Sequence, residues 1–368
     1  MEAFVGCFSD LADPREDNTR HDLHEILLIA LCALLCGGED CSDMALFGRS
    51  KEGFLRQFLR LKHGVPSHDT FSRLFRHLDP VKFHECFLKF INSFTAGLAG
   101  VVAVDGKTLR RSFDRASAKS PLHLVSAWAC EQRLFLGQIA VDGKSNEITA
   151  LPKLLELLAL KGRMITADAM HCQRATCAAI VAQGGDYVIA LKGNQGALHD
   201  DVRRLFTDKD HRPEAVDQVT DADHGRIETR SAAITSQIGW LTQTHAWPGL
   251  KAIGAITRRR QVALKTTEET TYYLLSTPMD AARLNATVRA HWSIENALHW
   301  VLDVTMNEDA TRNRKDHGPQ NLALLRRMAL NFARLEGSKG SMKGKLKRAG
   351  WDDAFLTSIL KAGCAHMR

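Results

Sequence analysis

Two short apolar runs each end in an aspartate, an unusual position for a charged side chain. VVAV precedes Asp105, and RMITA precedes Asp168. Either residue alone is explained as a turn cap, because Asp105 precedes Gly106 in a common turn pair. If the runs are adjacent strands of one sheet, both carboxylates reach one edge, where their charges repel unless a cation lies between them. Since carboxylate oxygens suit Mg²⁺ and Mn²⁺, the pair indicates a divalent-cation site.

A third acidic residue lies in the segment AHWSIENALHWVLDV, which carries His291, Glu295, His299 and Asp303 at four-residue steps. On an α-helix, four residues advance about 400° and rise about 6 Å, so these side chains form one polar stripe. The two histidines are about 12 Å apart along the axis, too far to share a zinc ion easily. The spacing favours Glu295 as a carboxylate directed into a cleft, with a zinc site and a solvated helix face as alternatives.

The elements that would position these carboxylates follow from hydrophobic periodicity. Short apolar runs predict five strands, and helix-period runs between the last three predict two helices. The expected strands are 101–106, 122–129, 134–141, 163–169 and 186–192, and the expected helices are 146–160 and 172–185. The order β-β-β-α-β-α-β predicts an α/β fold, a mixed sheet with helices packed on it.

Three further regions flank or interrupt this core. Residues 1–98 carry apolar positions at helix spacing and basic polar faces, which suit a DNA-contacting bundle or a mere helical cap. Polar alternating segments between about 200 and 280 predict a β-rich insertion. Residues 336–368 are expected to form a basic C-terminal tail. Between 310 and 350 there are eleven Lys or Arg against two acidic residues, and 11 − 2 gives a local excess of nine positive charges.

Composition limits the class of protein and its surroundings. Apolar residues make up 45% and charged residues 25%, as in ordinary globular proteins, and 49 − 42 gives a net charge of +7 that favours a polyanionic partner. Nine cysteines without a CxxC pair indicate buried reduced thiols and a reducing compartment. The most apolar run, 26–38, is shorter than the roughly 20 residues that span a bilayer. We therefore expect a cytoplasmic protein with no membrane partner.

Several long motifs resemble one family. VDGKTLRRS, ITADAMHCQ, YVIALKGNQ, HGRIETR and HWSIENALHWVLDVTMNEDATRNR are similar, in the same order, to the H-repeat-associated group of bacterial insertion-sequence transposases. These are DDE transposases with an RNase H-like core. DPREDNTRHDLHEILLIALCALLCGGED and GVPSHDTFSRLF resemble the amino-terminal associated domain of that group. The resemblance covers about residues 10–335 and implies a catalytic domain at 99–335 that contains the insertion.

The resemblance also implies a catalytic triad and its chemistry. Asp105, Asp168 and Glu295 match the three acidic positions of the family. They would hold two Mg²⁺ or Mn²⁺ ions, with Asp105 on both, Asp168 on one and Glu295 on the other. Two metals about 3.5–4 Å apart stabilise the attacking and leaving oxygens of an in-line displacement. The enzyme would nick DNA at the element ends, and the freed 3′-hydroxyl would attack target DNA. We expect a homodimer or higher oligomer on DNA.

The helix that carries Glu295 departs from the pattern of the related superfamily. The usual Tyr, Arg and Lys positions fall on Val288, His291 and Leu302. His291 and His299 would contact DNA phosphate or orient the carboxylates. The residues expected to contact DNA are Lys107, Lys192, Arg226, Arg289, His291, Trp292 and His299.

Two other functions remain open from the sequence. One is a DNA-binding protein that derives from a transposase and is catalytically idle. The other is a metal-dependent nuclease that cleaves without strand transfer. All three acidic residues are present, which argues against the idle protein.

Overall fold

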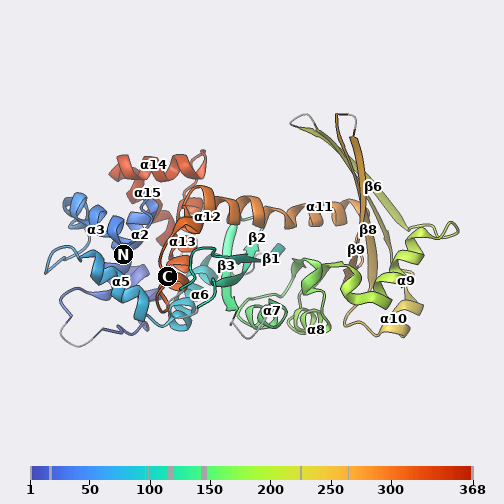
Figure 1. Cartoon of the computed structure of the whole chain (residues 1–368), viewed down its shortest axis with the longest axis horizontal. Helices are drawn as coiled ribbons and strands as arrows, with labels where there is room; N and C mark the ends of the chain where they lie inside the picture. The colour runs from blue at the N-terminus through green and yellow to red at the C-terminus, as the bar shows by residue number, and fades with distance from the viewer. Residues whose placement is uncertain are drawn as a thin grey trace.

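The computed structural model has three regions along its long axis: a helical bundle where the two ends of the chain meet, the central part of a sheet, and a projecting antiparallel part of the same sheet, called the projecting sheet below (Figure 1). The structure describes residues 2–15, 19–95, 97, 99–114, 119–141, 147–223, 226–263 and 265–365. Within these ranges, no helix is long and apolar enough to cross a membrane.

The central sheet has the predicted order of elements. Its strands are β1 (Gly100–Thr108), β2 (His123–Ala129), β3 (Leu134–Val141), β4 (Arg163–Ala167) and β5 (Asp186–Leu191). Helix α7 (Glu147–Glu156) joins β3 to β4, and α8 (Arg174–Ala182) joins β4 to β5. Strands β4 and β5 run parallel to β1, whereas β2 is antiparallel to both β1 and β3. This is the mixed α/β sheet that the sequence predicted.

The central strands are apolar runs because both faces of the sheet are covered. All five residues of β4 are buried, as are Val101, Val102, Ala103 and Val104 of β1. Strands covered on both faces lose the polar alternation of a half-exposed sheet. Asp168 directly follows the last residue of β4, as the sequence predicted. Asp105 does not end its strand, because β1 continues to Thr108, but burial becomes partial at this residue.

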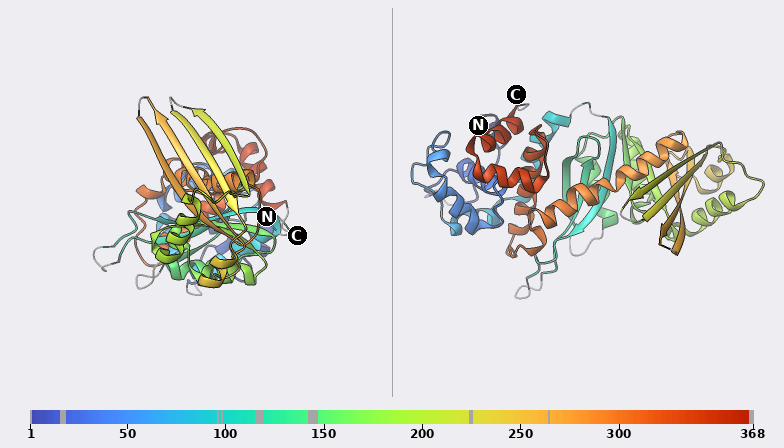
Figure 2. Two further views of the ribbon diagram at one scale, coloured as in Figure 1. Left: turned by 90° about the vertical axis from the view of Figure 1, so that its right-hand side faces the viewer. Right: turned by 90° about the horizontal axis from the view of Figure 1, so that it is seen from above.

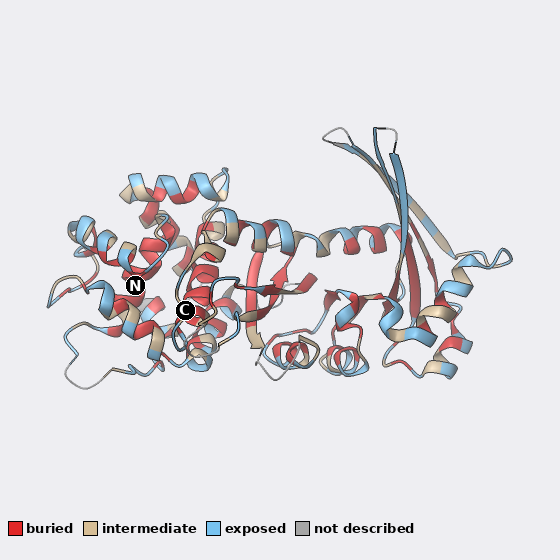
Figure 3. Ribbon diagram, in the orientation of Figure 1, coloured by how far each residue is buried: buried red, intermediate tan, exposed pale blue. Residues whose placement is uncertain are grey.

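The β-rich insertion lengthens the central sheet instead of forming a separate one. It contains α9 (Gly196–Thr207), β6 (Ala215–Asp223), β7 (Arg226–Thr235), α10 (Gly239–His245), β8 (Ala252–Val262) and β9 (Lys265–Leu275). Strand β9 pairs antiparallel with β5, so the full order is β3-β2-β1-β4-β5-β9-β8-β7-β6. The bases of β8 and β9 are buried and their distal halves are exposed (Figure 3).

A long helical segment connects the insertion to the bundle. It consists of α11 (Ala281–His291), a π-helical turn (Ile294–His299) and α12 (Trp300–Val304). In Figure 1 and in the right-hand view of Figure 2, this orange segment runs from the projecting sheet across the central sheet to the bundle. Its turn 294–299 contacts β1, and this contact brings Glu295 to the edge of the sheet.

The bundle joins the two ends of the chain. Its N-terminal helices are α1 (Glu2–Cys7), α2 (Leu23–Leu35), α3 (Cys41–Ser50), α4 (Glu52–Leu55), α5 (His68–His77) and α6 (Pro80–Thr95). Helix α2 is central, because Asp22 caps its N-terminus and eleven of its thirteen residues are buried. Helix α13 (Gly318–Leu335) packs against α2, α5, α6 and β3. The bundle therefore contacts the central sheet directly.

The residues expected to form a basic C-terminal tail instead form α14 (Met342–Trp351) and α15 (Asp353–Cys364). Both helices pack on α13, and α14 also contacts α2. Lys345 is buried, its Nζ lying 2.9 Å from a carboxylate oxygen of Glu336 and 3.0 Å from the carbonyl oxygen of Ala333. Lys345 is thus a packing residue, while Lys343 and Lys347 of the same helix remain exposed.

The nine cysteines are unpaired, and the six at positions 32, 41, 86, 130, 172 and 177 are buried. The burial of these six agrees with the buried thiols that the sequence predicted, whereas Cys7, Cys36 and Cys364 are partly exposed.

His84 links α6 to β3 and gives a test of the packing between bundle and sheet. Its Nε2 accepts a hydrogen bond from the backbone N–H of Gln138 at 3.2 Å. Burial lowers the pKa of His84 from 6.5 to about 4. In the unfolded chain, His84 takes up a proton below about pH 6.5, whereas in the folded chain it does so only near pH 4. The free energy of unfolding therefore falls as the pH falls through this window.

Between about pH 7 and about pH 5, we expect the free energy of unfolding to fall by about 2 kcal/mol less in His84→Gln than in wild type. Glutamine can still accept the Gln138 bond but has no proton to bind. Urea titrations at the two pH values measure the difference. His68→Gln, which changes an exposed histidine of α5, is the control. The same pH dependence in wild type and in His84→Gln would contradict this account of His84.

Candidate active site

Strand pairing brings Asp105 and Asp168 to one edge of the sheet. Val104 of β1 pairs with Ala167 of β4 in parallel register, so the next residue of each strand is an aspartate. The two strands that precede the aspartates are therefore neighbours in the sheet, as the predicted cation site requires. Asp168 caps a short 3-10 turn, where its side chain accepts a hydrogen bond from the backbone N–H of His171 at 3.4 Å.

Asp105 is the more enclosed of the two aspartates. Its side chain is 26% exposed, whereas that of Asp168 is 49% exposed. Burial raises the pKa of Asp105 to about 6 together with the negative charges of Glu295, Asp168 and Glu147, while a hydrogen bond from the Gly106 backbone N–H acts in the opposite direction. Four carboxylates thus share one electrostatic environment, and their mutual repulsion is the kind that a bound cation relieves.

Glu295 reaches this edge from a π-helical turn. The backbone N–H of Trp300 donates to the Glu295 carbonyl five residues earlier, instead of the four of an α-helix. The sequence predicted a continuous α-helix here, and that prediction was wrong between 294 and 299. Isolated π-turns inside α-helices are frequent at functional sites. Glu295 is largely exposed, but the part of its side chain that is shielded from water is enough to raise its pKa.

The π-turn is held by side chains from other elements. The indole N–H of Trp128 on β2 donates to the Ser293 hydroxyl at 3.1 Å. The guanidinium of Arg334 on α13 stacks 4.4 Å from the centre of the Trp128 ring and donates to the Ala297 carbonyl. Because these contacts come from distant parts of the chain, spacing within the helix could not reveal the turn.

The two histidines of the stripe face inward. His299 Nδ1 lies 3.5 Å from Asp105 Oδ2, and His291 Nδ1 lies 3.0 Å from the Thr166 hydroxyl. Burial lowers the pKa of His291 to about 4. Burial, with the positive charges of Arg327 and Lys107, lowers the pKa of His299 to about 3. A neutral imidazole offers phosphate no positive charge, so this geometry favours the orienting role over phosphate contact.

The position of Lys107 corrects one expected DNA contact. Lys107 is only 7% exposed, and its Nζ lies 2.7 Å from Asp303, 3.2 Å from Asp309 and 3.9 Å from Glu308. Three carboxylates already surround the ammonium group, so it is not available to DNA phosphate. Asp303, the last residue of the polar stripe, therefore has a structural role as a partner of Lys107.

Apart from the two histidines, the other expected DNA contacts remain accessible, and all of them remain predictions. Lys192 is exposed where β5 ends, and Arg226 is exposed where β7 begins. Arg289 pairs with Asp221 of β6. Trp292 is 45% exposed, and the Arg258 guanidinium lies 5.7 Å from the centre of its ring.

Three residues near the aspartates were missed from the sequence: His123 of β2, Glu147 of α7 and His171 of the turn after Asp168. The neighbouring imidazoles of His123 and His171 lower the pKa of Glu147 to about 2. The only available signal was their position, since each stands at an end of a predicted strand or helix. Polar residues at such ends usually cap turns, so position alone does not single them out.

The donor set fits a hard divalent cation in type and charge. Carboxylate oxygens are what Mg²⁺ and Mn²⁺ prefer, and the remaining ligands of such ions are often water and phosphate oxygens. Throughout the described ranges, no three His, Cys, Asp or Glu side chains surround one point closely enough to hold a metal ion together.

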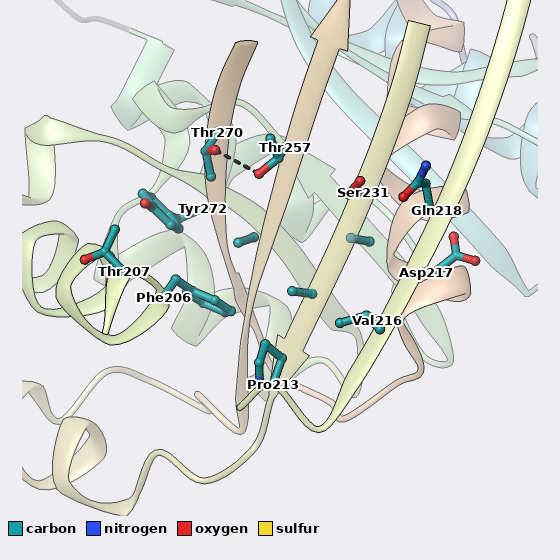
Figure 4. A pocket seen from close by; sticks show the side chains of 13 residues that line it. Phe206, Thr207, Pro213, Val216, Asp217, Gln218, Ser231, Thr257, Thr270 and Tyr272 are labelled. Atoms are coloured by element: carbon teal, nitrogen blue, oxygen red, sulfur yellow. Dashed lines mark hydrogen bonds between the residues drawn. The ribbon is translucent and has the colours of Figure 1, made fainter. Parts of the chain in front are cut away.

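The groove of about 390 Å³ in Figure 4 lies apart from these carboxylates, on the projecting sheet beside α9. One row of its lining crosses all four strands through Gln218, Ser231, Thr257 and Thr270. The hydroxyls of Thr257 and Thr270 share a hydrogen bond of 2.8 Å. Because none of the four clustered carboxylates lines this groove, it is not part of the candidate active site.

Comparison with known proteins identifies the family. A family model described as Transposase DDE domain matches residues 97–332, and one described as DDE_Tnp_1-associated matches residues 5–91. H repeat-associated putative transposase YhhI of Escherichia coli is 36% identical over 349 residues, which cover 92% of each chain. A Xanthobacter autotrophicus protein, named Uncharacterized protein in dhlA 3'region, is 49% identical over 260 residues, 69% of this chain and 88% of its own.

Among solved structures, a piggyBac transposase synaptic complex with hairpin DNA aligns with a TM-score of 0.45 and 13% identity, covering 98% of this chain and 81% of its own. At that score the alignment adds no argument to the family match. The matched family models and the relatives show that the chain belongs to the DDE transposases, in the H-repeat-associated group that its motifs resemble.

Proposed function

We propose that this DDE transposase nicks DNA at the ends of an insertion element and joins the freed 3′-hydroxyl to target DNA. The observation that carries the proposal is the shared electrostatic environment of Asp105, Asp168 and Glu295, three carboxylates from separate elements. They are the three residues that the resemblance to the family implies as its triad.

Each residue would have a distinct part in this chemistry. Asp105 would hold both divalent cations, Asp168 one and Glu295 the other. Bound Mg²⁺ or Mn²⁺ would supply charge stabilisation for the attacking and leaving oxygens of the phosphodiester. His299 lies beside Asp105 and would hold that carboxylate in orientation. Since Asp168 and Glu295 are exposed, a DNA backbone could approach the site without an opening motion.

One assay separates this proposal from its two rivals. Paired element-end DNA, target plasmid and Mg²⁺ are incubated with the protein, and nicked ends and joined products are counted. Transposition predicts both products, and we expect paired ends to bind a homodimer or higher oligomer. Cleavage without joining would identify a nuclease, and binding without cleavage would identify a catalytically idle protein. Either result would overturn the proposal.

A basic hollow is the best-supported place for DNA phosphate. It has a volume of about 430 Å³ and lies between α5 and residues 312–318. Its charged lining residues are Arg76, Arg312, Arg314 and Lys315, together with one carboxylate, Asp114. Arg76 is paired with Asp316, but Arg312 and Lys315 are exposed and form no ion pair with any residue in the described ranges. Arg312 and Lys315 lie in the segment between α12 and α13, and their exposed positive charges suit contact with DNA phosphate.

We expect Arg312→Ala with Lys315→Ala to flatten the dependence of log affinity on log salt by up to about two units, because each lost phosphate contact removes about 0.9. Affinity for element-end and random DNA should fall alike, since phosphate contacts carry no direct sequence information. Fluorescence anisotropy at several salt concentrations measures the slope. Lys82→Ala with Lys89→Ala, two cations of α6 paired with Glu85 and Asp10, is the matched control. An unchanged slope would move the contact elsewhere, with Lys343 and Lys347 next to test.

A further inference from the structure

Three polar side chains without a part in the proposed chemistry meet beside the two aspartates. Glu147, the first residue of α7, lies between two imidazoles. Its Oε1 is 2.6 Å from His123 Nε2, and its Oε2 is 3.4 Å from His171 Nε2. His123 Nδ1 in turn lies 2.7 Å from the Thr108 hydroxyl of β1. We call His123, Glu147 and His171 the bridging cluster.

The bridging cluster lies close to both aspartates, against β1 next to Asp105 and beside the turn that begins at Asp168. A Cβ added to Gly106 would lie 2.5 Å from Glu147 Oε2 and 2.6 Å from His123 Nε2, so the cluster lies against the backbone next to Asp105. On the other side, His171 Nε2 lies 4.0 Å from Asp168 Oδ1. Glycine at position 106 is therefore needed for close approach, which a turn preference alone would not require.

The burial of His171 shows that the cluster is more than a helix cap. Its side chain is 1% exposed, and Nδ1 is buried without a hydrogen-bond partner in the described part of the chain. A buried polar atom without a partner costs about 1–3 kcal/mol, so an apolar residue would stabilise this position better. Helix α7 could be capped by one exposed side chain, without a second, buried imidazole.

We propose that Glu147 is a positioning residue of the phosphoryl-transfer centre, which acts through His123 and His171 to fix the carboxylates of Asp105 and Asp168 relative to each other. This inference rests on the proposed function of that centre. Both oxygens of Glu147 already face imidazole nitrogens, so it acts on the cation ligands without being one. Neighbours that orient metal ligands typically change metal affinity or activity by 10–100-fold when they are replaced.

The test compares Glu147→Gln, which keeps the shape and removes the charge, with Glu156→Gln. Glu156 is an exposed carboxylate at the other end of the same helix. Mn²⁺ affinity of the DNA-free protein is measured by electron paramagnetic resonance, and nicking is followed against Mg²⁺ concentration. We expect Glu147→Gln to weaken Mn²⁺ binding and to raise the half-saturating Mg²⁺ concentration, both by about 10–100-fold. Glu156→Gln should match wild type.

Several outcomes would overturn the inference. If Glu147→Gln lowers the thermal midpoint but leaves Mn²⁺ affinity and Mg²⁺ requirement unchanged, the cluster only anchors α7. If Mn²⁺ binding disappears entirely, Glu147 is itself a ligand. Should Glu147→Gln fail to fold, His123→Gln removes one side of the bridge and is expected to shift both metal readouts in the same direction. Wild-type protein that binds Mn²⁺ without nicking DNA would overturn the proposed function alone, because the comparison of affinities still tests the cluster.

Discussion

Asp105→Asn is expected to abolish Mg²⁺-dependent nicking while DNA binding survives. The substitution keeps the shape of the side chain and removes the carboxylate that would hold both cations. Metal ions contribute several kcal/mol of charge stabilisation, so the expected loss is about 10³-fold in rate or more. Single-turnover nicking of a labelled element end measures the rate, and a mobility-shift titration measures binding. Asp168→Asn and Glu295→Gln should behave in the same way.

Glu268→Gln is the control for these variants, because it neutralises an exposed carboxylate on β9 away from the triad. It should nick DNA at the wild-type rate. Near wild-type nicking by any one of the three triad variants would remove that residue from the proposed centre. Loss of DNA binding together with nicking would instead indicate a folding defect, which circular dichroism of the same preparation detects.

Arg327→Leu is expected to lower the free energy of unfolding by about 3–5 kcal/mol, because it leaves a buried carboxylate without its partner. Arg327 of α13 is 0% exposed and Glu308 is 3% exposed. Their side chains meet at 2.7 Å, and the same guanidinium group donates to the Ala323 carbonyl. Urea denaturation of the purified protein measures the change.

Removing both partners separates a lost attraction from an uncompensated charge. The double variant Arg327→Leu with Glu308→Leu should recover most of the lost stability, because apolar pairs often replace buried ion pairs at little cost. Arg110→Leu is the control, since its side chain is 82% exposed in the pair with Asp309. That change should cost about 1 kcal/mol or less. If Arg327→Leu costs no more than Arg110→Leu, the buried pair does not stabilise the fold as expected.

Local patterning predicted the central sheet and the aspartate pair. Apolar runs of strand length alternate with helix-period runs, and this periodicity depends on near neighbours in the chain. Strands β1, β2 and β3 pair antiparallel in turn, so β3 runs in the same direction as β1. Helix α7 then carries the chain from β3 to β4, and the parallel pairing of β4 with β1 places Asp105 next to Asp168. The expected tail failed for a related reason. Counting charges between 310 and 350 did not show that Lys345 points into the packing between α13 and α14.

By itself, the sequence determined the strand and helix order, the two aspartates that follow apolar runs, the glutamate on a later helix and, through its long motifs, the family. All of these depend on residues close together in the chain or on the order of motifs along it. Only the tertiary structure decided that Glu295 stands on a π-turn held by Trp128 and Arg334, and that Lys107 is surrounded by carboxylates 196 to 202 positions away. It also placed Glu147 between His123 and His171. Burial and pairing of charges depend on which distant side chains arrive at the same place, and no spacing within one element contains that information.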